Sequence, residues 1–274
     1  MKRRLAFLPV TPGRCLAVAL VPNAAGNAPS AHAQDEVFTP SPGMNGLSDA
    51  GRANWGLGIG IGATRKPYAG IGTTTQALPL IFFDNRYVRA LGSGGDLKLP
   101  SAGPLAFGLR LRYAPKAYNQ SDAPILNGMA DRKGGLLAGV GTGLRIDYGV
   151  LTAEVLNDVS GHSKGSQVKL GFAAPMRFGA FSVTPQIAAQ WLDSKTVDYN
   201  YGVRASEVRA GRPKYDGRST LNTELGVRTG YALTRDQTLT LDIGTTWFGS
   251  GVTNSPLVER NWQSSVRLGY IHRF

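Results

Sequence analysis

The stretch Leu136-Leu-Ala-Gly-Val-Gly-Thr-Gly-Leu-Arg-Ile-Asp-Tyr148 decides the fold of this 274-residue chain. Its even-numbered positions are apolar apart from one threonine, and they end in an aromatic ring. Its odd-numbered positions are mostly glycine and charged residues. Because successive side chains of a β-strand point to opposite faces, this pattern predicts a strand with one apolar face and one face of glycine and charge.

The same alternation recurs along the chain and predicts twelve strands. Glycine supplies 36 of the 274 residues, which disfavours long helices. After residue 35 no run of about 18 apolar residues occurs, so the sequence contains no candidate for a membrane-spanning helix there. The predicted strands are 53–62, 75–83, 86–91, 95–100, 105–114, 135–148, 150–159, 165–177, 180–192, 218–231, 236–248 and 262–274.

Two classes of all-β protein show such alternation, and they differ in which face is buried. In a soluble sandwich the apolar face forms the core, whereas in a membrane barrel it contacts lipid. Strand lengths near the 9–11 residues of a tilted membrane strand favour the barrel. So do aromatic residues near the strand ends, as in an interfacial girdle. The residues of this expected girdle are Trp55, Tyr113, Tyr148, Trp191, Tyr231, Trp247 and Tyr270.

The connections also alternate in length, which is typical of an antiparallel up-and-down transmembrane β-barrel with short periplasmic turns and longer outer loops. An even number of strands closes the sheet and leaves no exposed edge. Turns are expected near 84–85, 101–104, 149, 179 and 234–236. Outer loops are expected at 63–74, 92–94, 115–134, 160–164, 193–217 and 249–261.

The first residues have the pattern of a secretory signal. Basic residues come first, an apolar stretch follows at 16–21, and Ala31-His32-Ala33 gives a cleavage site. We therefore expect a signal peptide at 1–33, a periplasmic segment at 34–52 and the barrel at 53–274. The single cysteine, Cys15, leaves with the signal, so the mature chain can form no disulfide, thiol nucleophile or cysteine–metal site.

Loss of the signal leaves 26 basic and 18 acidic residues, a net charge of +8. Export argues against nucleic acid as a partner. The anionic headgroups of outer-membrane lipid and the phosphates of lipopolysaccharide are the better candidates. The basic and aromatic residues of 115–134 and 193–217 suit lipopolysaccharide phosphates, or they are simply solvated loops. These residues are Lys116, Tyr118, Arg132, Lys133, Tyr199, Tyr201, Arg204, Arg209, Arg212, Lys214 and Tyr215.

If the apolar face contacts lipid, the other face lines the lumen and carries a ladder of charges. Eight bases and four acids can pair to narrow the barrel, or they can line a pore that favours anions. A barrel of twelve strands lies between narrow barrels filled by side chains and wide porins. The expected ladder consists of Arg110, Arg112, Arg145, Asp147, Glu154, Lys169, Arg177, Glu224, Arg228, Asp242, Arg267 and Arg273.

The C-terminal strand ends in the pattern of an assembly signal for outer-membrane barrels. Val266, Leu268, Tyr270 and Phe274 lie at even spacing, with the aromatic residue last. By analogy, the outer-membrane assembly machinery would recognise this segment as an unpaired strand. The alternative is an ordinary final strand of a soluble β-protein.

By its motifs the chain resembles the MipA/OmpV family of outer-membrane proteins across nearly its whole mature length. The matching stretches are 54–58, 67–70, 79–83, 132–136, 158–161 with 164–165, 201–203 and 269–274. The resemblance implies a monomeric outer-membrane barrel. For MipA-like members it implies a scaffold that links a lytic transglycosylase to a bifunctional murein synthase. Other members are associated with osmotic response, adhesion or antibiotic susceptibility, and the family offers no catalytic motif to transfer.

Two patterns could indicate enzymatic chemistry. Gly58-Ile-Gly-Ile-Gly-Ala63 fits a dinucleotide fingerprint, but no helix follows it, so we interpret it as lumen-facing glycine and expect no cofactor. Asp158, Ser160, His162 and Ser163 contain the residue types of a hydrolase. They crowd one short loop, and residues this close cannot easily adopt the geometry of nucleophile, base and orienting group, so we interpret them as a turn. Two histidines remain in the mature chain, too few for a histidine-rich metal site.

The sequence therefore favours a non-enzymatic outer-membrane scaffold that contacts the murein machinery from the periplasm. The second hypothesis is a small diffusion pore, an osmotic-response porin or an adhesin. The third is a lipid-modifying enzyme that uses His162.

Overall fold

The computed structural model describes residues 53–274, so the predicted signal peptide (1–33) and periplasmic segment (34–52) lie outside the described residues. Its strands are β1 (Asn54–Arg65), β2 (Thr73–Asp84), β3 (Val88–Leu91), β4 (Gly94–Ala102), β5 (Leu105–Ala114), β6 (Gly135–Ile146), β7 (Gly149–Asp158), β8 (Ser166–Ala173), β9 (Met176–Phe178), β10 (Phe181–Leu192), β11 (Thr220–Ala232), β12 (Gln237–Trp247) and β13 (Trp262–Arg273). Its helices are α1 (Ser194–Tyr201) and α2 (Ser250–Thr253), with 3-10 turns at Pro124–Leu126 and Ala205–Glu207.

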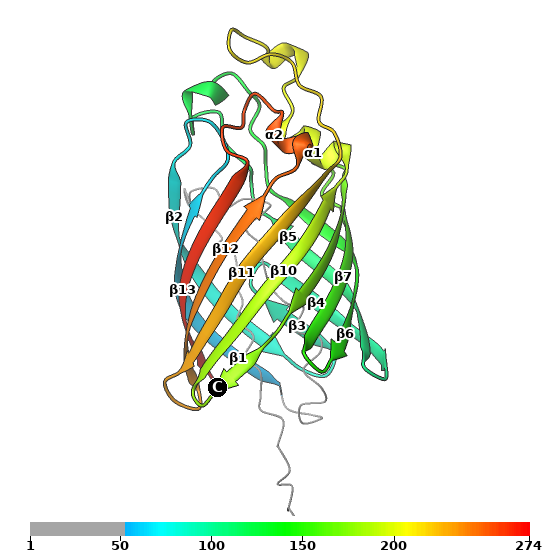
Figure 1. Ribbon diagram of the computed structural model, residues 1–274, viewed down its shortest axis with the longest axis vertical. Helices are drawn as coiled ribbons and strands as arrows, with labels where there is room; N and C mark the ends of the chain where they lie inside the picture. Colours follow the sequence, from blue (N-terminus) through cyan, green and yellow to red (C-terminus); the bar gives the residue numbers. More distant parts are fainter. Residues whose placement is uncertain (1–52) are drawn as a thin grey trace, which may run out of the picture.

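The strands form one antiparallel sheet that closes on itself (Figure 1). The first strand, β1, pairs with the last, β13, from Gly56↔Arg273 to Arg65↔Ser264. Both β8 and β9 pair with β10, so they are two parts of one strand of the barrel wall. The break between them falls at Pro175, which has no N–H to donate. The predicted class and the predicted twelve-stranded wall are confirmed.

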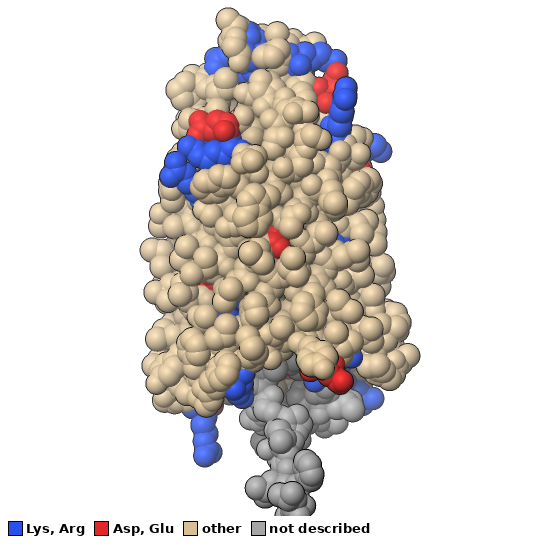
Figure 2. All heavy atoms as spheres, in the orientation of Figure 1, with Lys and Arg blue, Asp and Glu red and all other residues tan. Residues whose placement is uncertain are grey.

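The outer surface of the wall is apolar. Ile59, Val140 and Leu268 are more than half exposed, and in each case the neighbouring glycine or arginine faces the lumen. Figure 2 shows charged atoms gathered toward the two ends of the molecule, with mainly uncharged atoms between them. Such a band is expected where strands contact hydrocarbon, and it excludes the sandwich, in which these side chains would be buried together.

No helix within residues 53–274 has the length and apolar character needed to cross a membrane.

The two ends of the barrel differ. We call them the loop end, with segments 66–72, 115–134, 159–165, 193–219 and 248–261, and the turn end, with segments 85–87, 103–104, 147–148, 179–180 and 233–236. The C-terminus lies at the turn end (Figure 1). In outer-membrane barrels the short turns are periplasmic, so we assign the turn end to the periplasm.

Several predicted strand ends were wrong because alternation continues through tight turns. Residues 147–148 were predicted inside a strand, but the pair Ile146↔Gly149 closes a hairpin around them. The strand predicted at 86–91 begins at Val88, because Asn85 Oδ1 accepts the N–H groups of Tyr87 and Val88 at 2.8 and 2.7 Å. The outer loop predicted at 92–94 is a two-residue turn with Gly92 at φ 65°.

One long strand has a neighbour on one side only for most of its length. β2 pairs with β1 throughout, but its pairing with β3 covers Phe82–Asp84 alone, so residues 73–81 pair only with β1 among the described strands. Pro79 lies in this stretch, where its missing N–H costs no second ladder bond.

The last residue reinforces closure of the barrel. The ring of Phe274 stacks on Trp55 of β1, with centroids 4.2 Å apart and planes at 18°, and its N–H donates to the Trp55 carbonyl at 3.0 Å. The contact therefore strengthens the seam at which the first strand, β1, pairs with the last strand, β13.

We expect Phe274→Ala to lower the yield of folded barrel in lipid vesicles, because a stacked aromatic pair contributes about 0.5–1.5 kcal/mol beyond its buried area. The measurement is the fraction that stays compact in unheated gel electrophoresis. Phe178→Ala is the control, because Phe178 is equally exposed (62% against 60%). Equal yields for the two variants would contradict a role for the stack.

Candidate functional site

The lumen side of β4, β5 and β7 carries a buried cluster of charges. Arg110 donates to Asp96 at 2.9 Å, and Arg112 donates to the other oxygen of Asp96 at 2.7 Å and to Glu154 at 3.3 Å. Both arginines are on β5 and Glu154 is on β7, so their ion pairs with Glu154 cross β6. Gly141 of β6 makes this possible, because a Cβ there would lie 2.3 Å from Arg110 Nε.

A second set of charges lies on the opposite part of the wall. Lys169 of β8 reaches across β10 to Glu224 of β11 at 2.7 Å. Arg228 donates to Asp242 on the neighbouring strand. In the strand register Asp242 lies opposite both Arg228 and Arg267.

Sequence reasoning missed four members of the charged wall. Asp84 accepts from Arg89 and Lys98, and Asp96 bridges the two arginines of β5. Asp84 ends β2, Arg89 lies on the four-residue strand β3, and Asp96 and Lys98 lie on β4, where only Leu97 and Leu99 mark the apolar face. For Asp96 and Lys98, the signal that could have found them is their alternation with the apolar residues Leu97 and Leu99.

Other predicted ladder positions lie at the turn end. Asp147 was expected in the lumen, but it is exposed in the turn between β6 and β7, which is a correction. Arg145 and Arg177 are exposed near the same end, and Arg273 lies over the ring of Phe82 at 5.9 Å. Burying a charge is costly, and at the rim these side chains keep contact with water.

The expected aromatic girdle falls into two groups. Tyr113, Trp191 and Trp247 lie at the loop end of their strands, and Trp55, Tyr231 and Tyr270 at the turn end. Tyr148 differs from both groups, because it lies in a turn and is 84% exposed.

The largest apolar cluster of the described residues lies in the loops, at the mouth of the barrel. We call it the loop cap; its aromatic centre is Tyr68, which contacts Tyr118 and Tyr201 at ring distances of 5.3 and 5.4 Å. Its buried members are Tyr68, Ile71, Ala117, Tyr118, Ala123, Leu126, Met129, Leu192, Val197, Tyr201, Val203, Phe248, Val252 and Leu257.

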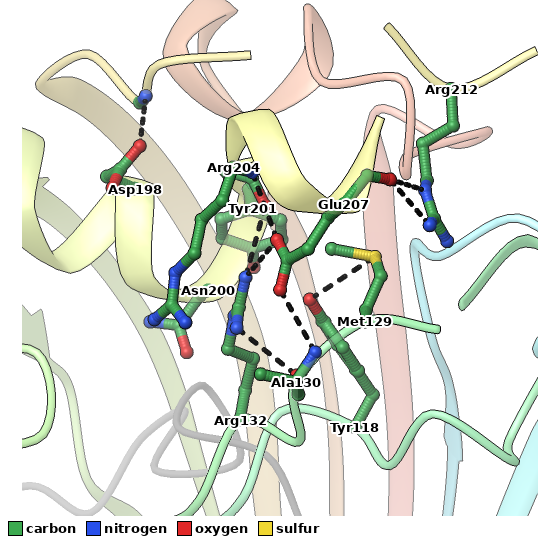
Figure 3. A network of polar contacts seen from close by, with 12 residues as sticks. Tyr118, Met129, Ala130, Arg132, Asp198, Asn200, Tyr201, Arg204, Glu207 and Arg212 are labelled. Atoms are coloured by element: carbon green, nitrogen blue, oxygen red, sulfur yellow. Dashed lines mark hydrogen bonds and ion pairs between the residues drawn. The ribbon is translucent and has the colours of Figure 1, made fainter. Parts of the chain in front are cut away.

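A buried ion pair joins two loops of the cap (Figure 3). Arg132 donates to Glu207 at 3.0 Å, and Glu207 also accepts the N–H groups of Ala130 and Arg204, each at 3.0 Å. Arg212 donates to the Glu207 carbonyl at 2.6 and 2.9 Å and to the carbonyl of Asn127 at 3.1 Å. These bonds fasten loop 203–217 onto loop 124–132.

The environment of Glu207 favours its charged form. Burial raises the pKa of this carboxyl, but the hydrogen bonds from Ala130, Arg204 and Arg132 outweigh burial, so the pKa lies below the ordinary 4.5. Burial also raises the pKa of Tyr68, which donates to the Asn200 carbonyl at 3.2 Å.

The two interpretations of the basic and aromatic loops both need correction. Tyr118, Arg132, Tyr201 and Arg212 are buried in the cap, because they hold the loops to one another. They are therefore neither solvated nor free to grip lipopolysaccharide. Lys133, Arg204, Arg209 and Lys214 of the same loops are exposed.

The possible hydrolase residues form a turn. Asp158 accepts from Ser160 Oγ at 2.6 Å and from the N–H groups of Ser160, Ser163 and Lys164. His162 Nδ1 lies 3.3 Å from Ser160 Oγ. The serine thus lies between acid and histidine, whereas a triad needs histidine in the middle. In residues 53–274 no group of three or more His, Cys, Asp or Glu side chains could hold a metal ion.

Comparison with known proteins gives a family match and several relatives. The profile of the family described as MltA-interacting protein MipA matches residues 57–274. The MltA-interacting protein of Escherichia coli K12 is 26% identical over 80% of this chain and 89% of its own. An outer membrane protein of Vibrio anguillarum, Omp26La, is 24% identical over 66% of this chain and 69% of its own.

Among solved structures, an outer membrane channel from Pseudomonas putida F1 superposes with a TM-score of 0.43 at 14% identity, covering 86% of this chain and all of that one. The translocator domain of the autotransporter NalP from Neisseria meningitidis gives 0.44 at 7% identity, covering 85% and 91%.

We expect acid to loosen the loop cap. Since the pKa of Glu207 is lowered by folding, its contribution to stability is complete above pH 4.5 and is lost as the pH falls through the folded pKa. At neutral pH, Glu207→Gln should lower the free energy of cap opening by about 3 kcal/mol, which is roughly a 100-fold loss of amide protection.

Hydrogen exchange at the amides of 130 and 204, corrected for intrinsic rate, measures this opening. Asp216→Asn is the control, because Asp216 is exposed and its ion pair, with Lys214, lies within loop 203–217. If the amides of 130 and 204 are equally protected in Glu207→Gln and in the wild type, the Arg132–Glu207 ion pair does not hold the cap together.

Proposed function

Because this chain belongs to the MipA family of outer-membrane proteins, and is itself an outer-membrane β-barrel, we propose that it is a non-enzymatic envelope scaffold. In this proposal its periplasmic end holds a murein hydrolase of the lytic transglycosylase class beside a murein synthase. The name of the Escherichia coli relative, MltA-interacting protein, supports the choice of partner.

The observation that carries the proposal is the fastened loop cap. A channel needs a path through both ends, whereas the cap places a buried apolar cluster and the ion pair Arg132–Glu207 at the outer mouth. Many lumen charges are also engaged with one another rather than presented to a passing ion, as at Arg110 and Arg112. Breaking such buried pairs costs about 3–5 kcal/mol, so they favour a rigid wall.

The turn end offers a surface for protein partners. Tyr87 and Tyr148 lie in turns beyond the strand ends and are 61% and 84% exposed. The guanidinium of Arg86 lies 5.5 Å from the Tyr87 ring. Exposed tyrosine and arginine are enriched in protein interfaces, and this combination supports docking at the periplasmic face.

The second candidate is a diffusion pore. The observation in its favour is the basic lumen, where Arg110, Arg112 and Arg267 are buried on the inner face of the wall. A pore of this charge would favour anions.

Two measurements separate the candidates. We expect the purified protein to give no steady unitary current in a planar bilayer, because the buried cluster of the loop cap lies at the mouth. We also expect a lytic transglycosylase of the same bacterium to co-purify with the protein, and the double variant Tyr87→Ala, Tyr148→Ala to retain less than a fifth of it.

Tyr231→Ala is the control for the retention experiment, because Tyr231 lies on the lipid face of β11 near the same end. Steady unitary currents would support the pore. Equal retention by the double variant and by Tyr231→Ala would contradict docking at the turns.

A further inference from the structure

A pocket of about 40 Å³ lies at the loop end, beside the cap and apart from the charge ladder. It forms where four segments meet: 114–115, 133–137, 158–167 and helix α1. The side chains that matter for its chemistry are those of Lys133, His162, Gln167, Thr196, Tyr199 and Asn200.

Two glycines allow these segments to meet. A Cβ at Gly135 would lie 2.6 Å from Ser160 Oγ, and a Cβ at Gly165 would lie 2.1 Å from Thr196 Oγ1. At 165 a Cβ would also lie 2.6 Å from the Thr196 backbone nitrogen, so a larger residue there would push the segments apart, whereas at 135 the Ser160 side chain would have to move. Asp193 also caps α1 by accepting from Thr196 N at 2.8 Å, which fixes the helix that forms one wall.

An aromatic surface forms part of the pocket. The rings of Tyr199 and His162 are nearly parallel, at 9°, with centroids 6.4 Å apart. Tyr199 is held in place, because its hydroxyl donates to the Lys133 carbonyl at 3.0 Å and the Arg132 guanidinium lies 5.9 Å from its ring. A fixed ring of this kind offers a flat surface to the C–H face of a sugar.

The polar groups of the pocket have bonding capacity to spare. No described residue hydrogen-bonds to His162 Nε2 or forms an ion pair with the Lys133 ammonium, although Nδ1 of the histidine is held by Ser160. Gln167 accepts from Gln190, which leaves its amide N–H groups. A cation beside several hydrogen-bond donors suits an anion with hydroxyl groups.

The pocket lies at the height of the outer membrane surface. Gln167, in its wall, pairs with Leu192, and the next pair toward the membrane joins Val168 to Trp191, an aromatic residue at the loop end of the lipid face. Lipid headgroups are found just beyond such a girdle.

From these observations we propose that the pocket and the open surface beside it bind a phosphorylated sugar, because a pocket of about 40 Å³ admits only part of the molecule. Tyr199 packs against the sugar ring, Lys133 pairs with the phosphate, and His162 and Gln167 hydrogen-bond to the hydroxyl groups. The sugar is either part of a lipopolysaccharide headgroup or a free sugar phosphate, since both present the same chemistry at this height.

The first experiment uses the full barrel in detergent, with glucose 1-phosphate as the probe and glucose as its uncharged match. Isothermal titration should show at least tenfold tighter binding of the phosphate. Lys133→Gln should weaken that binding about tenfold. Lys214→Gln is the matched control, because it removes the same charge from an exposed loop lysine outside the pocket.

A separate variant tests the ring without removing a charge. Tyr199→Leu should weaken binding of both sugars, while Tyr199→Phe should retain the stacking and most of the affinity. The proposal is overturned if the wild type does not distinguish glucose 1-phosphate from glucose. It is also overturned if Lys133→Gln and Lys214→Gln bind alike.

A second arm identifies the source of the sugar. Mass spectrometry measures the lipopolysaccharide that co-purifies with each variant. Less lipopolysaccharide with Lys133→Gln than with Lys214→Gln assigns the pocket to the lipid headgroup. Equal amounts, together with weakened titration of glucose 1-phosphate, assign it to a free sugar phosphate.

Discussion

The structure depends on one constraint: backbone N–H and C=O groups that lie in hydrocarbon must find partners within the protein. A sheet meets it only by closing on itself. Here closure joins β1 to β13, and the pairing runs for ten residues from Gly56 to Arg65. Along residues 73–81 of β2 the described strands supply a partner on one side only. The apolar exterior follows from the same constraint, because once the backbone is paired the side chains alone contact lipid.

Closure also determines what fills the interior. Glycine at alternate positions of β6 leaves space above the wall, and the long side chains of β5 use that space to reach Glu154. Where the wall has small residues, charges pair across a strand. The lumen is not uniformly polar, because Leu80 of β2 packs over Gly60 and Gly269. The glycines of β6 therefore make room for the arginine side chains of β5, and this space allows the ion pairs with Glu154 to form.

The loops beyond the strand ends also combine apolar packing with buried, paired charges. Four connections meet over the barrel in an apolar cluster, and the carboxylate of Glu207 accepts the bonds that hold two of them together. The result is a barrel with a fastened outer end and an exposed, tyrosine-bearing inner end. This difference between the two ends favours the proposed role as a scaffold over a role as a channel.

The sequence was sufficient for the class, the number of strands in the wall and the lipid-facing residues, because alternation over ten or more residues leaves little freedom. It missed Asp96 and Lys98 of β4, where Leu97 and Leu99 alone represent the apolar face, and it failed where alternation ran through a turn, as at Asp147. It could not reveal the cap. The contacts of Arg132 with Glu207 and of Tyr68 with Tyr118 join loops far apart in the chain, and no local pattern encodes such pairing.

The most direct test of the account asks which face of a strand contacts lipid. Single cysteines at 221 to 228 of β11, each carrying a nitroxide label, can be probed in vesicles with oxygen, which concentrates in hydrocarbon, and with a water-soluble nickel complex. The account predicts high oxygen accessibility at Leu221, Thr223, Leu225 and Val227 and low accessibility at the residues between them. High oxygen accessibility at residues 222, 224, 226 and 228 instead, or low accessibility at all eight positions, would contradict the account.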